Sequence, residues 1–130
     1  MIGRELMNTA FPVTASPGSF TVPVERLDGL RKLGFSDDEL YRIIAPRRTL
    51  ARRKAKGEVL SPVESDRVIR LERISEHGTR VFASAEKFRR WLRHESVALD
   101  GARPIDLMQS ETGARLVEDE LARIDHGMLA

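Results

Sequence analysis

Cysteine is absent from the sequence and aromatic residues are few, and both facts narrow what the chain can be. Without Cys among its 130 residues, it has no disulfide framework, thiolate metal site or cysteine nucleophile. Aromatic residues make up 5%, although hydrophobic residues reach 41%, which is enough for a core. No apolar run approaches the roughly 20 residues of a membrane span, and the first twenty residues lack the apolar segment of a signal peptide. We therefore expect a cytoplasmic protein that is not bound to a membrane.

The sequence also lacks the residue patterns of catalytic sites. Its three His residues do not show the spacing of a metal-binding motif such as HExxH, and no glycine-rich phosphate-binding loop is present. The acidic run at residues 118–120 is expected on a solvated face, because consecutive residues point to different sides of a helix. Ser61, Ser84 and Ser110 stand where helices begin and are predicted to be caps rather than nucleophiles. We expect no enzyme and neither a cofactor nor a metal.

Charge is distributed unevenly between the two halves of the chain. Residues 1–60 contain eleven Lys and Arg against seven Asp and Glu, whereas residues 61–130 contain eleven against thirteen. The net charge of +2 therefore combines a basic first half with an acidic second half. A basic half suits a polyanion, and an acidic half suits a protein partner.

The spacing of apolar residues predicts helices and no strands, so the expected class is all-α. Residues 1–22 lack helical periodicity and are interpreted as a flexible arm. Residues 23–60 are predicted to contain three short helices, the first of which includes Leu27 and Leu30. The signals for the helix ends are the N-cap Ser36, the break at Ala45–Pro46 and the C-cap Gly57.

Residues 61–130 are predicted to form a long helix followed by shorter ones. Ser61 and Glu64 have the spacing of a capping box, and the long helix that they start runs to about Phe82. Gly78 within it marks a bend or a close helix contact. The later signals are the N-cap Ser84, a turn at Pro104, the N-cap Ser110 and a stop at Gly127. In the last helix Ala114, Val117, Leu121 and Ile124 form a stripe that either closes the core or binds a partner.

The third short helix, over residues 47–56, carries six cations and no anion. Positive and negative side chains usually occur together on solvated helix faces. In addition, two short helices around a tight break are the outline of a helix-turn-helix unit. We therefore predict DNA contact, the other interpretation being a solvated face. At about 100° per residue Leu50, Ala51 and Ala55 face inward, and Lys54 and Lys56 mainly neutralise phosphates. The predicted DNA-binding residues are Arg48, Thr49, Arg52, Arg53, Lys54 and Lys56.

Three stretches of the sequence resemble the antitoxins of Xre–RES toxin–antitoxin systems, the MbcA/ParS/Xre group. They are RTLARRKAKGEVLSPVESDRVIRLERI, VFASAEKFRRWLRHES and ALDGARPIDLMQSETGARLVEDELARIDHG. The similarity extends over about residues 24–127. It implies an N-terminal Xre-like helix-turn-helix domain, expected at residues 23–60, and a helical C-terminal toxin-binding domain, expected at residues 61–130.

The resemblance also implies a function. Such antitoxins neutralise a RES-domain toxin, an NAD-degrading enzyme, by occluding its active site with their C-terminal segment, and they repress their own operon, usually as homodimers. Asp125 and His126 are the foremost candidates for that segment. The residues that match the segment facing the toxin are Leu121, Ile124, Asp125, His126 and Gly127. The alternative is a free-standing dimeric helix-turn-helix transcription regulator without a toxin partner.

Overall fold

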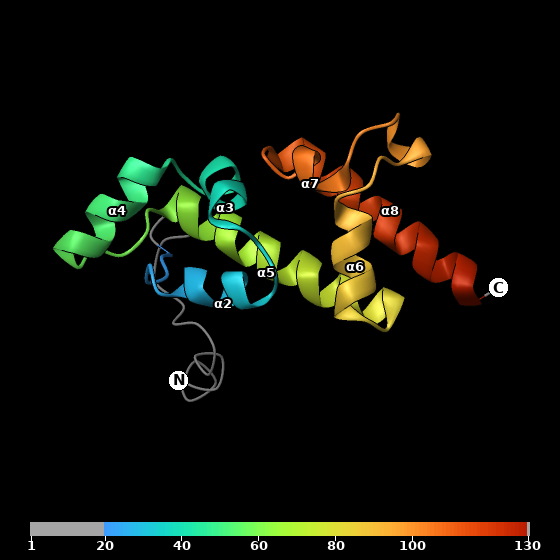
Figure 1. The fold of residues 1–130 in the computed structure, drawn as a ribbon, viewed down its shortest axis with the longest axis horizontal. Helices are drawn as coiled ribbons and strands as arrows, with labels where there is room; N and C mark the ends of the chain where they lie inside the picture. Colours follow the sequence, from blue (N-terminus) through green and yellow to red (C-terminus); the bar gives the residue numbers. More distant parts are fainter. Residues whose placement is uncertain (1–19, 130) are drawn as a thin grey trace, which may run out of the picture.

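The computed structural model describes residues 20–129, and this part of the chain is helical, which confirms the predicted all-α class (Figure 1). The described part has no strand and only two isolated backbone bridges. None of its helices combines the length and the apolarity that a membrane span needs. In chain order the helices are α2 (Arg26–Lys32), α3 (Asp37–Ile43), α4 (Arg47–Lys56), α5 (Pro62–Phe82), α6 (Ala85–Leu92), the 3-10 helix η2 (Val97–Leu99), α7 (Pro104–Leu107) and α8 (Glu111–Leu129).

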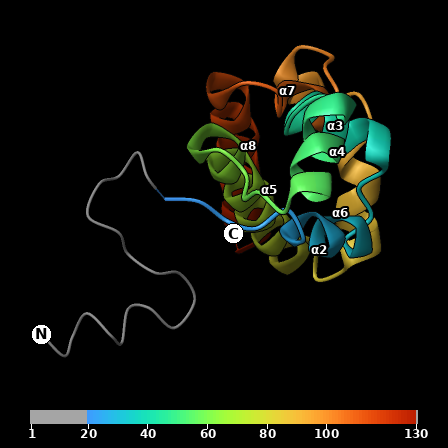
Figure 2. The same cartoon turned by 90° about the vertical axis from the view of Figure 1, so that its left-hand side faces the viewer.

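The long helix α5 is the axis of the fold. It has 21 residues and is therefore about 30 Å long. Helices α2, α6 and α8 all pack against it, and Figure 2 shows them gathered around it. Its buried stripe includes Val68, Leu71, Ile74 and Val81. Helices α3 and α4 lie at one end of the molecule and the last turn of α8 lies at the other (Figure 1).

A single hydrophobic core extends from Val22 to Leu121. The N–H of Val22 donates to Ser65 Oγ at 2.9 Å, and its carbonyl accepts from the N–H of Leu60 at 3.0 Å. The predicted arm over residues 1–22 is therefore wrong at Val22, and residues 1–19 lie outside the described part. Helical periodicity missed this segment because it is extended and enters the antiparallel bridge between Pro23 and Val59.

The predicted helix ends at Ser36, Ser61, Ser84 and Gly57 are confirmed. Ser36 and Ser61 each form a complete capping box, and Ser84 Oγ accepts from the N–H of Lys87 at 3.1 Å. Gly57 ends α4 with a φ of 67°, a left-handed conformation that glycine adopts without strain. These signals were readable because each cap bonds only to residues within its own first or last turn.

The predicted stop at Gly127 is wrong, because α8 continues to Leu129. Gly127 is exposed and helical, and a Cβ there would meet nothing within 4 Å. Glycine costs about 1 kcal/mol relative to alanine within a helix. That cost is too small to end a helix whose preceding turns are held by the core.

Gly78 marks a close helix contact, which is one of the two alternatives that the sequence left open. A Cβ at this position would lie 2.1 Å from ring atoms of Phe88 on α6. The ring of Phe88 is 6.4 Å from that of Phe82 and 6.1 Å from that of Trp91. The absence of a side chain at Gly78 therefore lets the aromatic cluster of α6 pack directly on the backbone of α5.

An ion pair joins α3 to the end of α6. Arg93 donates to both carboxylate oxygens of Glu39, at 2.8 and 3.0 Å, and to the carbonyl of Gly34 at 3.0 Å. Burial raises the pKa of Glu39, but the hydrogen bonds from Arg93 and from the Ser36 N–H bring it below its usual range. The first three helices are thus fixed to the second half by charge as well as by the core.

Candidate DNA-binding face and partner-binding segment

Helices α3 and α4 form a helix-turn-helix unit with a turn at Ile44, Ala45 and Pro46. Ile44 and Ala45 are buried, and Pro46 stands at the N-cap position of α4. The guanidinium of Arg67 on α5 donates to the carbonyl of Ile44 at 3.0 Å. Ile44 is the C-cap of α3, and the last carbonyls of a helix have no partner within it, so this contact from α5 satisfies the end of α3 and fixes the turn.

The exposed side of α4 is cationic. Arg48, Arg52 and Lys56 are exposed, and Thr49 is half-buried beside them. Spaced four residues apart, the three cations follow one face of the helix, and α4 contains no acidic residue that would offset them. Lys54 is also exposed. Arrays of this kind bind phosphates and the edges of bases.

Arg53 does not belong to that face, so its predicted outward position is wrong. Its Nε and Nη2 donate to the two carboxylate oxygens of Glu64 at 2.7 and 3.0 Å, and its Nη1 donates to Glu58 at 3.3 Å. The side chains of Arg53 and Glu64 are 17% and 11% exposed. A helical wheel for α4 alone missed this arrangement because the carboxylate comes from the first turn of α5.

The carboxylate of Glu64 is held by more than Arg53. Its Oε1 also accepts the N–H of Ser61 at 3.0 Å, within the capping box of α5. Burial raises the pKa of Glu64, but the hydrogen bonds from Arg53 and Ser61 together lower it by more. The pKa of Glu64 therefore lies below its usual range. The carboxylate is therefore ionised near neutral pH, as an ion pair with Arg53 requires.

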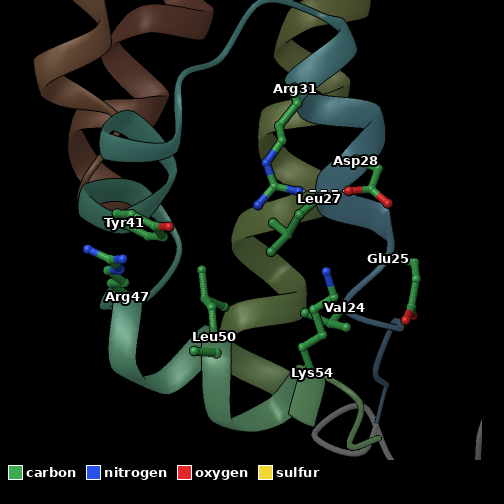
Figure 3. Close-up of a pocket in the computed structure, with 10 residues that line it drawn as sticks. Val24, Glu25, Leu27, Asp28, Arg31, Tyr41, Arg47, Leu50 and Lys54 are labelled. Atoms are coloured by element: carbon green, nitrogen blue, oxygen red, sulfur yellow. Dashed lines mark hydrogen bonds and ion pairs between the residues drawn. The ribbon is translucent and has the colours of Figure 1, made fainter.

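The inward side of α4 has fewer buried side chains than the helical spacing of its residues predicted. Only Leu50 is buried in α4, whereas Ala51 and Ala55 are exposed. A hollow of about 230 Å³ lies between α4 and helices α2 and α3, and Figure 3 shows the side chains that line it. The side chains around it include Val24, Leu27, Tyr41, Arg47, Leu50 and Lys54. The prediction that both Ala residues face inward is therefore wrong, because Ala51 borders this hollow and Ala55 is exposed.

The predicted partner-binding residues of α8 do not share one environment. Leu121 is fully buried in the core, so the prediction that it contacts a toxin is wrong. Ile124 and Asp125 are half-buried, whereas His126 and Gly127 are exposed. The Nδ1 of His126 lies 2.9 Å from the carbonyl of Ala122. The accessible part of the predicted segment is therefore its last four residues, at the free end of the molecule.

Among residues 20–129, Val97 is the most exposed of five large apolar side chains on the surface. Val97 in η2 is 96% exposed, and the sequence gave no signal for it because η2 lies in a predicted loop. Within residues 20–129 no group of three His, Asp or Glu side chains is placed to hold a metal ion. The candidate sites are still the exposed face of α4 and the end of α8.

Comparison with known families assigns both halves of the chain. Residues 24–73 match the antitoxin Xre-like helix-turn-helix domain, and residues 77–127 match the antitoxin Xre/MbcA/ParS C-terminal toxin-binding domain. A relative from Sphingobium sp. strain YBL2 is named Prs ADP-ribosylating antitoxin. It is 30% identical to this chain, and the match covers 83% of this chain and 82% of the relative's length. The chain belongs to the Xre/MbcA/ParS antitoxin family. The resemblance deduced from the sequence is thus confirmed.

Two further relatives of this family are named Antitoxin Xre. The one from Pseudomonas putida KT2440 is 33% identical over 65% of this chain, and the one from Yersinia enterocolitica is 30% identical over 65%. The matches cover 53% and 58% of these relatives, so the chain spans little more than half of their length. The two family matches meet between residues 73 and 77, inside α5. The division at residues 60 and 61 stays a prediction.

Proposed function

We propose that this protein is an antitoxin that neutralises a RES-domain, NAD-degrading toxin and represses its own operon. The observation that carries the proposal is the union, in one chain, of a match to a toxin-binding domain and a match to a helix-turn-helix domain. The cationic face of α4 and the free end of α8 lie at opposite ends of the molecule (Figure 1). One chain can therefore hold a protein at one end and DNA at the other.

On the toxin side, we propose that the end of α8 covers the active site of the toxin. Ile124, Asp125, His126 and Gly127 are accessible there, and a pocket that binds NAD accepts polar and charged groups, which Asp125 and His126 supply. One relative is named Prs ADP-ribosylating antitoxin. ADP-ribosylation uses NAD as its donor, so this name supports a partner with an NAD pocket.

Co-expression with the neighbouring toxin gene tests this half of the proposal. The full chain should restore growth, whereas a variant that ends at Ile124 should not. Asp125→Ala and His126→Ala should each weaken rescue, and Thr112→Ala, an exposed change at the other end of α8, should not. If the full chain fails to rescue growth while it still binds promoter DNA, the protein is the alternative, a free-standing regulator without a toxin partner.

On the DNA side, we propose that α4 is the recognition helix. Arg48, Thr49 and Arg52 are placed to reach base edges or phosphates, and Lys54 and Lys56 to neutralise the backbone. A homodimer would present two such helices to two half-sites about 34 Å apart, one turn of DNA. Light scattering of the free protein and of its promoter complex measures whether two chains are present.

Salt dependence of promoter binding tests the recognition helix. Arg48→Ala and Arg52→Ala should each weaken binding, and each should flatten the slope of log affinity against log salt by about 0.9 if one phosphate contact is lost. Lys87→Ala removes an equal charge from an exposed position on α6 and should change neither quantity. Unchanged affinity and slope in both Arg variants would show that α4 does not contact DNA.

A further inference from the structure

Among the six cations of α4, Arg53 is bound to the next helix of the protein. Its guanidinium makes two parallel hydrogen bonds to Glu64, at 2.7 and 3.0 Å. This bidentate geometry fixes direction as well as distance, because the planar guanidinium must lie in the plane of the carboxylate. The pair is also shielded, with 17% and 11% of the two side chains exposed.

The carboxylate that receives Arg53 is itself immobilised on α5. Glu64 Oε1 accepts the Ser61 N–H at 3.0 Å, and the Glu64 N–H donates to Ser61 Oγ at 3.1 Å. This reciprocal capping box ties the Glu64 side chain to the first turn of α5. The ion pair therefore fixes the orientation of α4 relative to α5, the central helix of the fold.

Apolar packing does little to fix α4 by itself. Leu50 is its one buried side chain, Ala51 and Ala55 are exposed, and a hollow of about 230 Å³ lies between α4 and α2. The turn before α4 fixes its first residues, but with one buried Leu the helix has little apolar packing to oppose rotation about its own axis. The ion pair lies one turn further along the helix and opposes this rotation.

We propose that Glu64 is a positioning residue for DNA binding, and that its ion pair with Arg53 sets the angle at which α4 presents Arg48 and Arg52. This inference rests on the proposed DNA binding by α4. Charge repulsion alone predicts the opposite effect on DNA affinity. A carboxylate beside a DNA-binding face repels phosphate, so removing the charge of Glu64 should tighten binding. The two accounts therefore predict changes of opposite sign.

The decisive variant is Glu64→Gln. Gln retains the shape of Glu and can replace it in a capping box, so the start of α5 is preserved while the charge that holds Arg53 is lost. We expect promoter affinity to fall about tenfold if roughly one molecule in ten keeps α4 in the competent orientation. The salt slope should stay unchanged, because no phosphate contact is removed.

Glu58→Gln is the matched control. Glu58 also accepts from Arg53, at 3.3 Å, but its side chain is 42% exposed, and exposed ion pairs contribute little. It removes the same charge from the same neighbourhood, and we expect affinity to stay within about twofold of the unchanged protein. Arg53→Gln removes the cationic partner of the same ion pair. It should weaken promoter binding as Glu64→Gln does, again without a change in the salt slope.

Two readouts separate a failure of this inference from a failure of the proposed function. If the unchanged protein binds no promoter DNA, the proposed function fails. Amide hydrogen exchange still tests positioning, since Glu64→Gln should speed exchange in residues 47–56 and not in α6. The double variant of Arg53 and Glu64 should be no weaker in DNA binding than either single variant, because one interaction is removed only once.

Tighter DNA binding by Glu64→Gln, or a steeper salt slope, would overturn the inference, since Arg53 would then be a DNA contact that Glu64 restrains. Exchange in α4 that stays at the rate of the unchanged protein would overturn it as well. Circular dichroism establishes that each variant is folded. If Glu64→Gln does not fold, Arg53→Gln, on the half-buried side of α4, gives the same comparison.

Discussion

Gly78→Ala is expected to destabilise the protein although alanine is the better helix former. In an exposed helix the change would stabilise by about 1 kcal/mol. Here the new Cβ would lie 2.1 Å from the Phe88 ring. That ring is 2% exposed and packs against Phe82 and Trp91, so it has no open space into which to move.

The magnitude follows from the displacement that the clash requires. An ordinary contact at this position needs 3.4 Å or more, so α6 must move away from α5 by roughly 1 Å, and overpacking of this kind costs about 3 kcal/mol. After the gain in helix propensity is subtracted, the net loss is about 2 kcal/mol. For a domain of this size, such a loss lowers Tm by roughly 8 °C.

Urea unfolding followed by tryptophan fluorescence measures this loss directly. Trp91 is the single Trp of the sequence, and its ring is 6.1 Å from that of Phe88. Gly29→Ala is the matched control, because a Cβ at Gly29 meets nothing within 4 Å, and it should stabilise by about 0.5–1 kcal/mol. Equal stabilisation by Gly78→Ala and Gly29→Ala would refute the steric argument.

Two further predictions concern the core and acid stability. Leu121→Ala should lower the free energy of unfolding by about 2–5 kcal/mol, and a loss of toxin binding without a loss of stability would contradict the core position of Leu121. The lowered pKa values of Glu39 and Glu64 stabilise the fold above the ordinary carboxyl pKa of about 4.3. This contribution should be lost as pH falls through and below that value. Glu39→Gln should flatten the acid side of the profile in urea titrations, and an unchanged profile would refute the argument.

The helix ends were predictable because their signals are local. A capping box such as that of Ser61 and Glu64 uses residues three apart in the sequence, and the propensity of Gly57 for a left-handed conformation belongs to glycine itself. The burial of Leu121 could also have been predicted, since Leu121 lies on the predicted apolar stripe of α8. Its assignment to a toxin contact came from the family resemblance, which aligns positions and does not show which side they face.

The errors concern contacts between segments that are distant in sequence. The wheel of α4 placed Arg53 outward because it contains no information about Glu64, and it placed Ala51 inward because it contains none about the hollow beside α2. Val22 belongs to the core through bonds to Leu60 and Ser65. No periodicity within the first 22 residues can show those bonds.

The continuous core has a consequence for how the protein is removed from the cell. Because α5 contributes to both halves and one cluster of side chains runs from Val22 to Leu121, the described part should unfold in one cooperative transition. A protease that unfolds the chain would then destroy both binding ends together. Under the proposed function, each degraded molecule would release a toxin and vacate an operator at the same moment, so resynthesis would begin as inhibition is lost.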